Sequence, residues 1–346
     1  MASGNDVTTF CGKRHSICLW YPCYVMRVLI TGITGLIGSH LADYLLELGG
    51  IEVIGFKRWR SSDSNISHLR GRVRLLEGDI EDPYSIAGAI EQARPDRIFH
   101  LAAQSYPSES WAAPSTTLAA NLGGTLNVLE AARRIVPQAR IHVAGSAAAY
   151  GRIRLEDVPI SEDRPLRPVS PYGVSKAAAE MLGYQAVESY GQQVYLTRAF
   201  IHIGPRQDAR PAAQTFARQI AEAEAGLRSP VIDVGNLHVQ RDFIDVADGV
   251  RGLWALIEHG EPGQVYNVCS GRATSIRALL DIYLSLTTGP FTVREDAARL
   301  RPADEPILQG DNRKLCSATG WQPVVPLEES ARRILDYWRA RVARGT

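Results

Sequence analysis

The chain lacks the features that mark several classes of protein. Its 38 Lys and Arg residues balance 37 Asp and Glu residues, which leaves a formal net charge of +1. Without an excess of positive charge, no overall field favours binding to nucleic acid or to an anionic membrane. No apolar stretch reaches the roughly 18 residues that a transmembrane helix needs. We therefore expect no nucleic-acid or membrane partner, and any anionic ligand must be held by local groups.

Cysteine is also scarce, with five residues in 346. Cys11, Cys18 and Cys23 lie at spacings that match neither a zinc site nor a disulfide framework. We therefore expect no metal and a reducing, cytoplasmic location. The apolar run ICLWYPCYV is not followed by a small-residue cleavage site such as a signal peptide has. We expect residues 1–25 to be a disordered extension, with Met26 as the natural start.

From Met26 on, short β-rich runs alternate with longer helical periods, which is typical of a parallel sheet covered by helices. The fold class predicted is α/β: a Rossmann-type doubly wound parallel sheet with a smaller, discontinuous C-terminal lobe. We expect the dinucleotide-binding domain to span residues 26–199 and about 241–271, because RDFIDV and VYNVCSG again look strand-like. The substrate-binding lobe would then comprise residues 200–240 and 272–346. The first six strands are expected at 27–31, 51–56, 73–78, 97–102, 140–145 and 194–198.

A glycine-rich turn follows the first expected strand and opens the first helix. In TGITGLIG, glycines at 32, 35 and 38 allow a tight turn, close approach of a pyrophosphate and close packing of helix on strand. The helix N-terminus also presents free N–H groups to phosphate. This context predicts a dinucleotide site formed by Gly32, Gly35, Leu36, Ile37 and Gly38, although such a turn can also be purely structural.

The end of the second expected strand indicates which dinucleotide binds. An acidic residue there holds a ribose 2′-hydroxyl, but GFKRWRSS has Lys57, Arg58 and Arg60 instead. Guanidinium and ammonium groups suit a 2′-phosphate, so NADP(H) is predicted over NAD(H). The alternative is an exposed basic loop without a ligand. Residues after the third and fourth strands would complete the cofactor site: Asp79 and Ile80 at the adenine, and Leu101, Ala102, Ala103 and Ser105 along the pyrophosphate and nicotinamide.

The candidate catalytic groups are a tyrosine and a lysine four residues apart in PYGVSK. This spacing places Tyr172 and Lys176 on one face of a helix that begins after Pro171. An adjacent ammonium would stabilise the phenolate and bring the tyrosine pKa closer to the working pH. The preceding strand ends at Ser146, so all three side chains can meet at the carboxyl edge of the sheet.

These motifs resemble those of the extended short-chain dehydrogenase/reductase family, from Met26 to about Arg339. TGxxGxxG, a Ser before YG and YxxxK are its defining set, and the stretches HLAAQS, RPVSPYGVSK and VGNLHVQRDFIDV add to the likeness. The sequence is most similar to GDP-4-keto-6-deoxy-mannose reductases and GDP-mannose 4,6-dehydratases. The resemblance implies that Asn121 braces the active-site helix, that His202 and Arg206 border the nicotinamide, and that a GDP-sugar is held by Ser105, Ser146, Arg218, Asn236, Arg241, Arg301 and Glu305. For each arginine alone, a solvated surface role is an equal alternative.

Two positions depart from the family pattern. Dehydratases of the family have a glutamate three residues before the glycine of the YG pair, where this chain has Ala148. A methyl group cannot move the proton that is lost when water is eliminated. Where relatives read FNH, this chain reads Phe200, Ile201 and His202, so an asparagine expected near the substrate phosphate is missing.

The sequence thus predicts NADPH-dependent reduction of the C4 ketone of a GDP-4-keto-6-deoxy-hexose, with a product of rhamnose or talose type. The alternatives are an NDP-sugar 4-epimerase, then a GDP-mannose 4,6-dehydratase, and, from another class, a non-catalytic NADP(H)-binding sensor. The intact Ser146, Tyr172 and Lys176 argue against a sensor. The resemblance also implies a homodimer or homotetramer.

Overall fold

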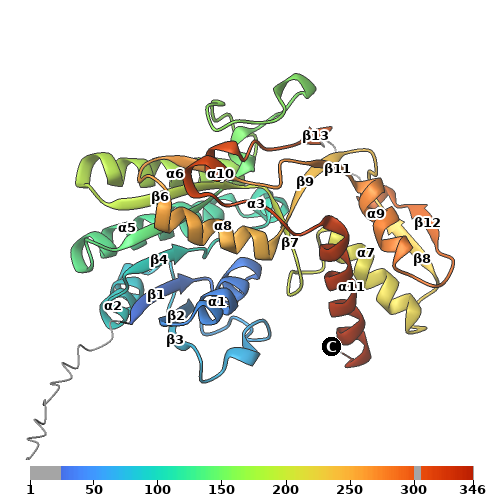
Figure 1. Cartoon of the computed structure of the whole chain (residues 1–346), viewed down its shortest axis with the longest axis horizontal. Helices are drawn as coiled ribbons and strands as arrows, with labels where there is room; N and C mark the ends of the chain where they lie inside the picture. The colour runs from blue at the N-terminus through green and yellow to red at the C-terminus, as the bar shows by residue number, and fades with distance from the viewer. Residues whose placement is uncertain (1–24, 300–304, 346) are drawn as a thin grey trace, which may run out of the picture.

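The computed structural model describes residues 25–299 and 305–345, and a seven-stranded parallel sheet forms its centre (Figure 1). The strand order is β3-β2-β1-β4-β5-β6-β10, so the chain reverses its direction of travel across the sheet between β1 and β4. This order is that of a doubly wound Rossmann-type sheet and confirms the predicted fold class. The strands are β1 (Met26–Thr31), β2 (Ile51–Lys57), β3 (Arg74–Glu77), β4 (Arg97–His100), β5 (Arg140–Ser146), β6 (Gln193–Ala199) and β10 (Val265–Val268).

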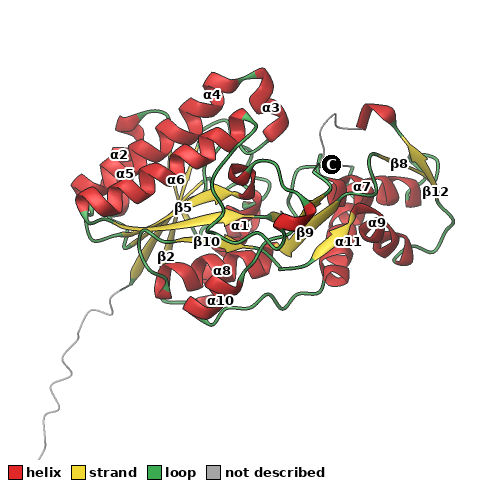
Figure 2. Ribbon diagram, turned by 90° about the horizontal axis from the view of Figure 1, so that it is seen from above, coloured by secondary structure: helices red, strands yellow, loops and turns green. Residues whose placement is uncertain are grey.

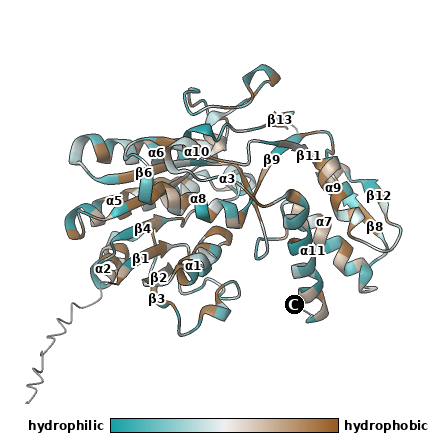
Figure 3. Ribbon diagram, in the orientation of Figure 1, coloured by the Kyte–Doolittle hydropathy of each residue, from teal (hydrophilic) through white to brown (hydrophobic). Residues whose placement is uncertain are grey.

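Helices cover both faces of this sheet, which explains why its strands are near-continuous apolar runs. Val28, Leu29 and Ile30 of β1 are fully buried, and Figure 3 shows β1 and β4 as hydrophobic. One face packs against α1 (Leu36–Leu48), α8 (Val246–His259) and α10 (Arg313–Thr319). The other packs against α2 (Pro83–Ala93), α5 (Gly124–Ile135) and α6 (Pro171–Tyr190), and Figure 2 shows these two helical layers edge-on.

A smaller lobe lies beside the sheet and has a core of its own (Figure 1). Phe216, Tyr283 and Trp338 are buried at its centre, where three helices meet. Its helices are α7 (Ala212–Glu224), α9 (Ile276–Ser285) and α11 (Leu327–Ala343), and its strand pair is β8 (Val231–Val234) with β12 (Thr292–Glu295). None of the described helices is long and apolar enough to cross a membrane.

A second, four-stranded sheet joins the two parts and includes residues 241–245, which were expected in the main sheet. Its central strand β9 (Gln240–Asp245) pairs with β7 (Ile201–Ile203), β11 (Ala273–Ser275) and β13 (Ile307–Leu308), and not with the main sheet. The buried Asp242 carboxylate of β9 accepts N–H groups from Ser270, Gly271 and Gly310. Ser270 and Gly271 lie in the connection from β10 to β11, and Gly310 follows β13, so these donors are found at the small sheet. The rest of the expected segment 241–271 does return to the main sheet, where α8 packs and β10 pairs with β6.

Candidate active site

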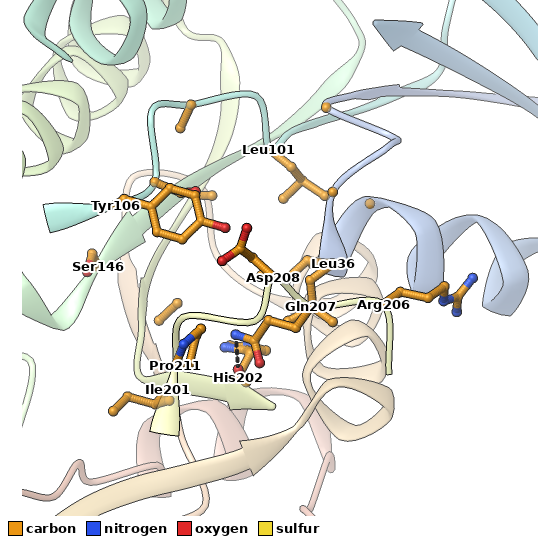
Figure 4. A pocket seen from close by; sticks show the side chains of 18 of the residues that line it. Leu36, Leu101, Tyr106, Ser146, Ile201, His202, Arg206, Gln207, Asp208 and Pro211 are labelled. Carbon is orange, nitrogen blue, oxygen red and sulfur yellow. Dashed lines mark hydrogen bonds between the residues drawn. The ribbon is translucent and has the colours of Figure 1, made fainter. Parts of the chain in front are cut away.

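A cavity of about 700 Å³ lies at the carboxyl ends of β1, β4 and β5, between the main sheet and the lobe. Ligands of doubly wound folds bind at this edge, where the strand order reverses. The sheet side of the wall includes the glycine turn after β1, the loop after β4, and Ser146, Tyr172 and Lys176. The lobe side includes His202 and the loop that precedes α7 (Figure 4). The fold therefore brings the two predicted sites, for cofactor and for chemistry, into one cavity.

The glycine turn has the geometry that a dinucleotide requires. Gly32 has φ +73°, and a Cβ there would lie 2.8 Å from the Ala102 nitrogen. A Cβ on Gly38 would lie 2.4 Å from the Gly32 carbonyl oxygen. Gly35 precedes α1, and the N-terminus of that helix lines the cavity through Leu36, Ile37 and Gly38. The turn thus fits the pyrophosphate of a dinucleotide, held by backbone N–H groups.

The basic cluster after β2 is arranged differently from the prediction. The Lys57 ammonium is buried and ion-paired with Glu77 at 3.0 Å and Asp63 at 3.2 Å. The hydrogen bond with Glu77 is the largest of the effects that raise the Lys57 pKa. Lys57 is therefore engaged within the protein, and Arg58 and Arg60 are the exposed cations of this loop.

Several other predicted cofactor residues divide between the cavity wall and the layer behind it. Leu101, Ala103 and Ser105 line the cavity. Ala102 lies behind the wall, where its N–H group donates to the Thr31 hydroxyl at 3.2 Å. The remaining predicted contacts lie outside this wall: Lys57, Arg58, Arg60, Asp79 and Ile80.

Ser146 and Tyr172 form the candidate proton-donating pair. Ser146 ends β5, and its Oγ accepts the Ala148 N–H at 3.2 Å, which leaves its own proton free to donate. Helix α6 is capped by Ser170, whose Oγ accepts the Gly173 N–H at 3.0 Å, and this places Tyr172 in the first turn. Burial raises the pKa of Tyr172, and a hydrogen bond with Ser146 partly offsets that effect. At neutral pH the phenol therefore carries its proton and can act as an acid.

Lys176 lies one turn further along α6 and also lines the cavity. Its Nζ donates to the carbonyl oxygen of Ala144 on β5 at 2.8 Å. Burial lowers its pKa to about 8. The sequence predicts that the Lys176 ammonium lowers the Tyr172 pKa. In the structure, Lys176 is instead directed to the end of β5, where it makes this hydrogen bond with the backbone.

Asn121 stands behind the cavity wall in a π-helical turn, Ala119–Gly123, between α4 (Pro114–Leu118) and α5. Its Oδ1 accepts the Gln104 N–H at 2.7 Å, and its Nδ2 donates to the Gln104 carbonyl at 3.0 Å. The same Nδ2 donates to the Ser175 hydroxyl of α6 at 2.9 Å. Asn121 therefore ties the loop after β4 to the helix that carries Tyr172.

His202 and Arg206 occupy different parts of the cavity. The buried His202 ring lines the wall, and its Nδ1 lies 3.1 Å from the Phe200 carbonyl oxygen. Arg206 points away from Ser146, toward α1 (Figure 4). Its Nη2 lies 2.6 Å from Asp43, and its Nη1 donates to the Asn65 carbonyl at 3.2 Å. These partners hold the Arg206 guanidinium beside α1, and its predicted contact with the nicotinamide end stays a prediction.

A second cavity, of about 240 Å³, continues from the first into the lobe. Ile201, Arg210 and Pro211 line both, and Asn236 and Arg241 line the second. Its other walls are largely apolar, formed by side chains of β7, β9, α7 and α9. Asp233 and Arg299 also line this second cavity, and the shared residues place it next to the first.

The other predicted substrate residues have separate places. Arg241 donates to the Glu305 carbonyl oxygen at 2.8 Å, and the Glu305 carboxylate accepts the Ile153 N–H at 3.2 Å. Arg218 faces Glu222 on α7 at 3.8 Å and lines neither cavity. Arg301 lies outside the described residues.

Two groups of cavity residues were missed in the sequence. Arg210 lies over the Tyr106 ring, 3.4 Å from its centroid, and is ion-paired with Glu109 and, at 2.7 Å, with Asp208. Tyr337 and Arg341 line the same cavity from α11, the last helix. The available signal was weak: Tyr106 and Asp208 lie in loops that follow strands at the edge where ligands bind.

Comparison with known proteins gives the family of the chain. A model for the family described as GDP-mannose 4,6 dehydratase matches residues 29–334. GDP-6-deoxy-D-mannose reductase of Pseudomonas aeruginosa is 35% identical over 316 residues, which cover 91% of this chain and 98% of the relative. Human GDP-mannose 4,6 dehydratase is 28% identical over 339 residues, covering 89% and 90%.

Solved structures agree with this assignment. RMD from Pseudomonas aeruginosa complexed with NADPH has a TM-score of 0.79 and 33% identity, covering 91% of this chain and 99% of that one. UDP-glucose 4-epimerase of Thermotoga maritima with UDP-glucose has a TM-score of 0.81 and 26% identity, covering 92% and 100%. The chain therefore belongs to the GDP-mannose 4,6 dehydratase family, within the extended short-chain dehydrogenase/reductase enzymes.

Proposed function

We propose that this enzyme uses NADPH to reduce the C4 ketone of a GDP-4-keto-6-deoxy-hexose to a GDP-6-deoxy-hexose of rhamnose or talose type. One observation carries the proposal: the turn after Ser146 has Ala148 where a dehydratase needs a glutamate, while Ser146, Tyr172 and Lys176 all line the cavity. Ketone reduction needs a proton donor and an orienting hydroxyl but no additional base. The resemblance to a GDP-6-deoxy-D-mannose reductase supports the same reaction.

The one carboxylate among the described residues of the cavity wall is a poor base for dehydration, which favours reduction as the reaction. Among the described residues that line the 700 Å³ cavity, Asp208 is the one carboxylate. Burial raises the pKa of Asp208, but its hydrogen bonds with Arg210 and the Arg210 charge hold the pKa below its ordinary value. A carboxylate that is stabilised in this way is a weak base for removing a proton from carbon. Asp208 is therefore a poor substitute for the missing glutamate.

The chain's own residues account for the proton side of the reduction. When bound, NADPH supplies the hydride that forms the new C4–H bond. Tyr172 donates its proton to the ketone oxygen, which becomes the hydroxyl, and Ser146 orients that oxygen by a hydrogen bond. Lys176 lines the cavity beside Tyr172, where its ammonium would hold the nicotinamide ribose. Solvent then returns a proton to Tyr172.

We further propose that the cofactor is NADPH rather than NADH. No acidic residue ends β2 to repel a 2′-phosphate, and Arg58 and Arg60 are exposed in the turn that follows. A structure of a relative 33% identical to this chain contains NADPH. Replacing both arginines by alanine should raise the Kd for NADPH about tenfold and leave that for NADH unchanged. Isothermal titration of both cofactors tests this.

The substrate's guanosine diphosphate would extend from the catalytic groups into the 240 Å³ cavity. The apolar walls of that cavity suit a base, and we expect Arg210 and Arg241, which line it, to hold the diphosphate. Ser105 is at the sugar end, in the wall of the larger cavity.

We also propose that two copies of the chain pair through the outer surface of α5 and α6. These helices lie side by side on one face of the sheet (Figure 2). Both helices carry exposed apolar side chains, Leu126 on α5 and Val174, Met181 and Tyr184 on α6. Exposed apolar side chains on neighbouring helices are typical of a symmetric interface. Met181→Glu should convert a dimer to a monomer in light scattering, whereas a wild-type monomer would contradict the pairing.

One assay tests the proposed reaction. Purified protein is mixed with NADPH and either GDP-4-keto-6-deoxy-mannose or GDP-mannose, while NADPH absorbance is followed and the sugar products are analysed. We expect one NADPH to be consumed per keto sugar and none with GDP-mannose. Conversion of GDP-mannose without net NADPH loss would instead indicate a dehydratase or an epimerase.

A further inference from the structure

A buried path of hydrogen bonds runs from the glycine turn to the catalytic helix, with His100 at its centre. His100 ends β4, and in the sheet it is paired with Thr31 at the end of β1. Its Nδ1 lies 2.9 Å from the Thr31 hydroxyl, and its Nε2 lies 3.1 Å from the Thr125 hydroxyl of α5. All three side chains are at most 4% exposed. The imidazole therefore links three elements of the active site without contact with water.

The neighbours of His100 determine which nitrogen carries the proton. The Thr125 hydroxyl donates its only proton to the Asn121 carbonyl oxygen, at 2.6 Å. Toward His100, Thr125 can then only accept, so the proton must be on Nε2. The Nδ1 atom is left as an acceptor, and the Thr31 hydroxyl donates to it. The Thr31 oxygen in turn accepts the N–H groups of Leu101 and Ala102, both at 3.2 Å.

The far end of the path reaches the backbone of Tyr172. Asn121, whose carbonyl oxygen receives the Thr125 proton, also donates through its side chain to the Ser175 hydroxyl at 2.9 Å. Ser175 donates to the Tyr172 carbonyl oxygen at 2.7 Å. The donors point in one direction from the turn beside Gly32 to α6, and the second proton of the Asn121 amide group goes to the Gln104 carbonyl oxygen. A change at His100 must therefore disturb both ends.

We propose that His100 is a positioning residue: its neutral Nε2–H imidazole holds the glycine turn and the Tyr172 helix at the spacing that hydride and proton transfer require. The reaction whose rate would report this is the proposed reduction, so the kinetic part of the proposal rests on that function. The tautomer and the hydrogen-bond directions follow from the distances alone. Burial, together with the nearby Lys176 charge, lowers the His100 pKa to about 3, consistent with an imidazole that stays neutral.

A second buried histidine provides a matched control. His142 lies on the adjacent strand β5, paired with Phe99, and is fully buried. Its Nε2 lies 3.0 Å from the Thr197 hydroxyl, and its Nδ1 has no hydrogen-bond partner. Burial lowers its pKa to about 3 as well. His142 therefore matches His100 in burial and protonation, but the path to Tyr172 does not pass through it.

The first test uses the wild-type protein and needs no substrate. In ¹⁵N-histidine-labelled protein, the His100 ring should show the Nε2–H tautomer, and its shifts should stay constant between pH 5 and pH 9. The resonances are assigned by their disappearance in His100→Gln or, if that variant does not fold, by their contacts with Thr31 and Thr125. An Nδ1–H tautomer, or titration in this range, would overturn the proposal.

The second test separates positioning from packing. His100→Phe and Thr125→Val should each lower kcat about ten- to a hundredfold with little change in KM for the keto sugar, because the catalytic groups are misplaced but the substrate contacts remain. His142→Phe should retain kcat, and His100→Gln, which keeps a donor and an acceptor, should recover part of it. Equal losses of kcat in His100→Phe and His142→Phe would show that His100 contributes only packing in the core, which would overturn the proposal. If the wild-type enzyme consumed no NADPH, the proposed function would be wrong. The NMR measurement would still decide whether His100 is the neutral Nε2–H tautomer.

Discussion

The two walls of the active-site cavity are built on different physical principles. On the sheet side, Tyr172 and Lys176 are each 8% exposed and are positioned by buried groups such as Asn121, which is 2% exposed. On the lobe side, the side chains of Arg210 and Asp208 are 49% and 39% exposed and are held by ion pairs. Exposed ion pairs contribute little to stability, about 0–1 kcal/mol, and can exchange partners readily. We therefore expect the sheet side to hold the catalytic groups in place and the lobe side to adjust to the substrate.

The largest effect is expected on the sheet side, from removing the proton donor. Tyr172→Phe should lower kcat about 10²- to 10⁴-fold, because the phenol is the proposed acid for the ketone oxygen. The NADPH dissociation constant should hardly change, since the ring that packs against the wall is retained. Single-turnover kinetics with cofactor titration measure both quantities. Retention of most of the activity would show that another group donates the proton.

The buried lysine provides a pH-dependent test of the same wall. Because burial lowers the Lys176 pKa from 10.5 to about 8, the folded protein holds this proton less tightly than the unfolded chain. Burying the ammonium therefore lowers the free energy of unfolding by about 3 kcal/mol below pH 8. This destabilisation disappears as the pH rises from 8 to 10.5. Lys176→Met should therefore be more stable than wild type at pH 7, by an amount that shrinks toward pH 10. Urea unfolding across this range would contradict the account if the difference were constant.

A third prediction concerns the backbone contacts of the glycine turn. A Cβ on Gly38 would lie 2.4 Å from the Gly32 carbonyl oxygen, so Gly38→Ala must displace α1 from the turn. The Kd for NADPH should rise at least about tenfold, or about 1.4 kcal/mol. The control is Gly88→Ala on α2, where a Cβ meets nothing within 4 Å. That change should stabilise the protein by about 0.5–1 kcal/mol without affecting NADPH binding.

The smallest effect on stability is expected on the lobe side. Arg210→Gln should change the free energy of unfolding by less than about 1 kcal/mol, because its ion pairs are half exposed. Its KM for the keto sugar should rise several-fold, because Arg210 lines both cavities. Arg339→Gln, which breaks a pair with Glu224 at 2.7 Å away from both cavities, should change neither. A KM effect in Arg339→Gln, or none in Arg210→Gln, would contradict the distinction between the two walls.

The same comparison shows how far the sequence could predict this molecule. The main sheet and the meeting of Ser146, Tyr172 and Lys176 follow from local signals: apolar runs, a glycine turn and i, i+4 spacing on one helix. Each of these signals is contained in a short stretch of chain, so local pattern was sufficient.

Contacts between distant residues could not be predicted in this way. Lys57 is neutralised by Glu77 of the neighbouring strand, and Arg206 is held by Asp43 of α1. Neither partner is visible from the basic residue's own surroundings in the sequence. The small sheet around β9 was missed for the same reason, because the three strands that pair with β9 come from three separated segments.

The central claim is that the enzyme adds a hydride to C4 of a keto sugar and Tyr172 supplies the proton. Its most direct test is to incubate GDP-4-keto-6-deoxy-mannose with NADPH that carries deuterium at the transferable position and to locate the label by NMR and mass spectrometry. We predict one deuterium at C4 of a GDP-6-deoxy-hexose for each NADP⁺ formed, with product formation slowed at least about a hundredfold in Tyr172→Phe. A product without deuterium at C4, or turnover with no NADP⁺ formed, would contradict the account.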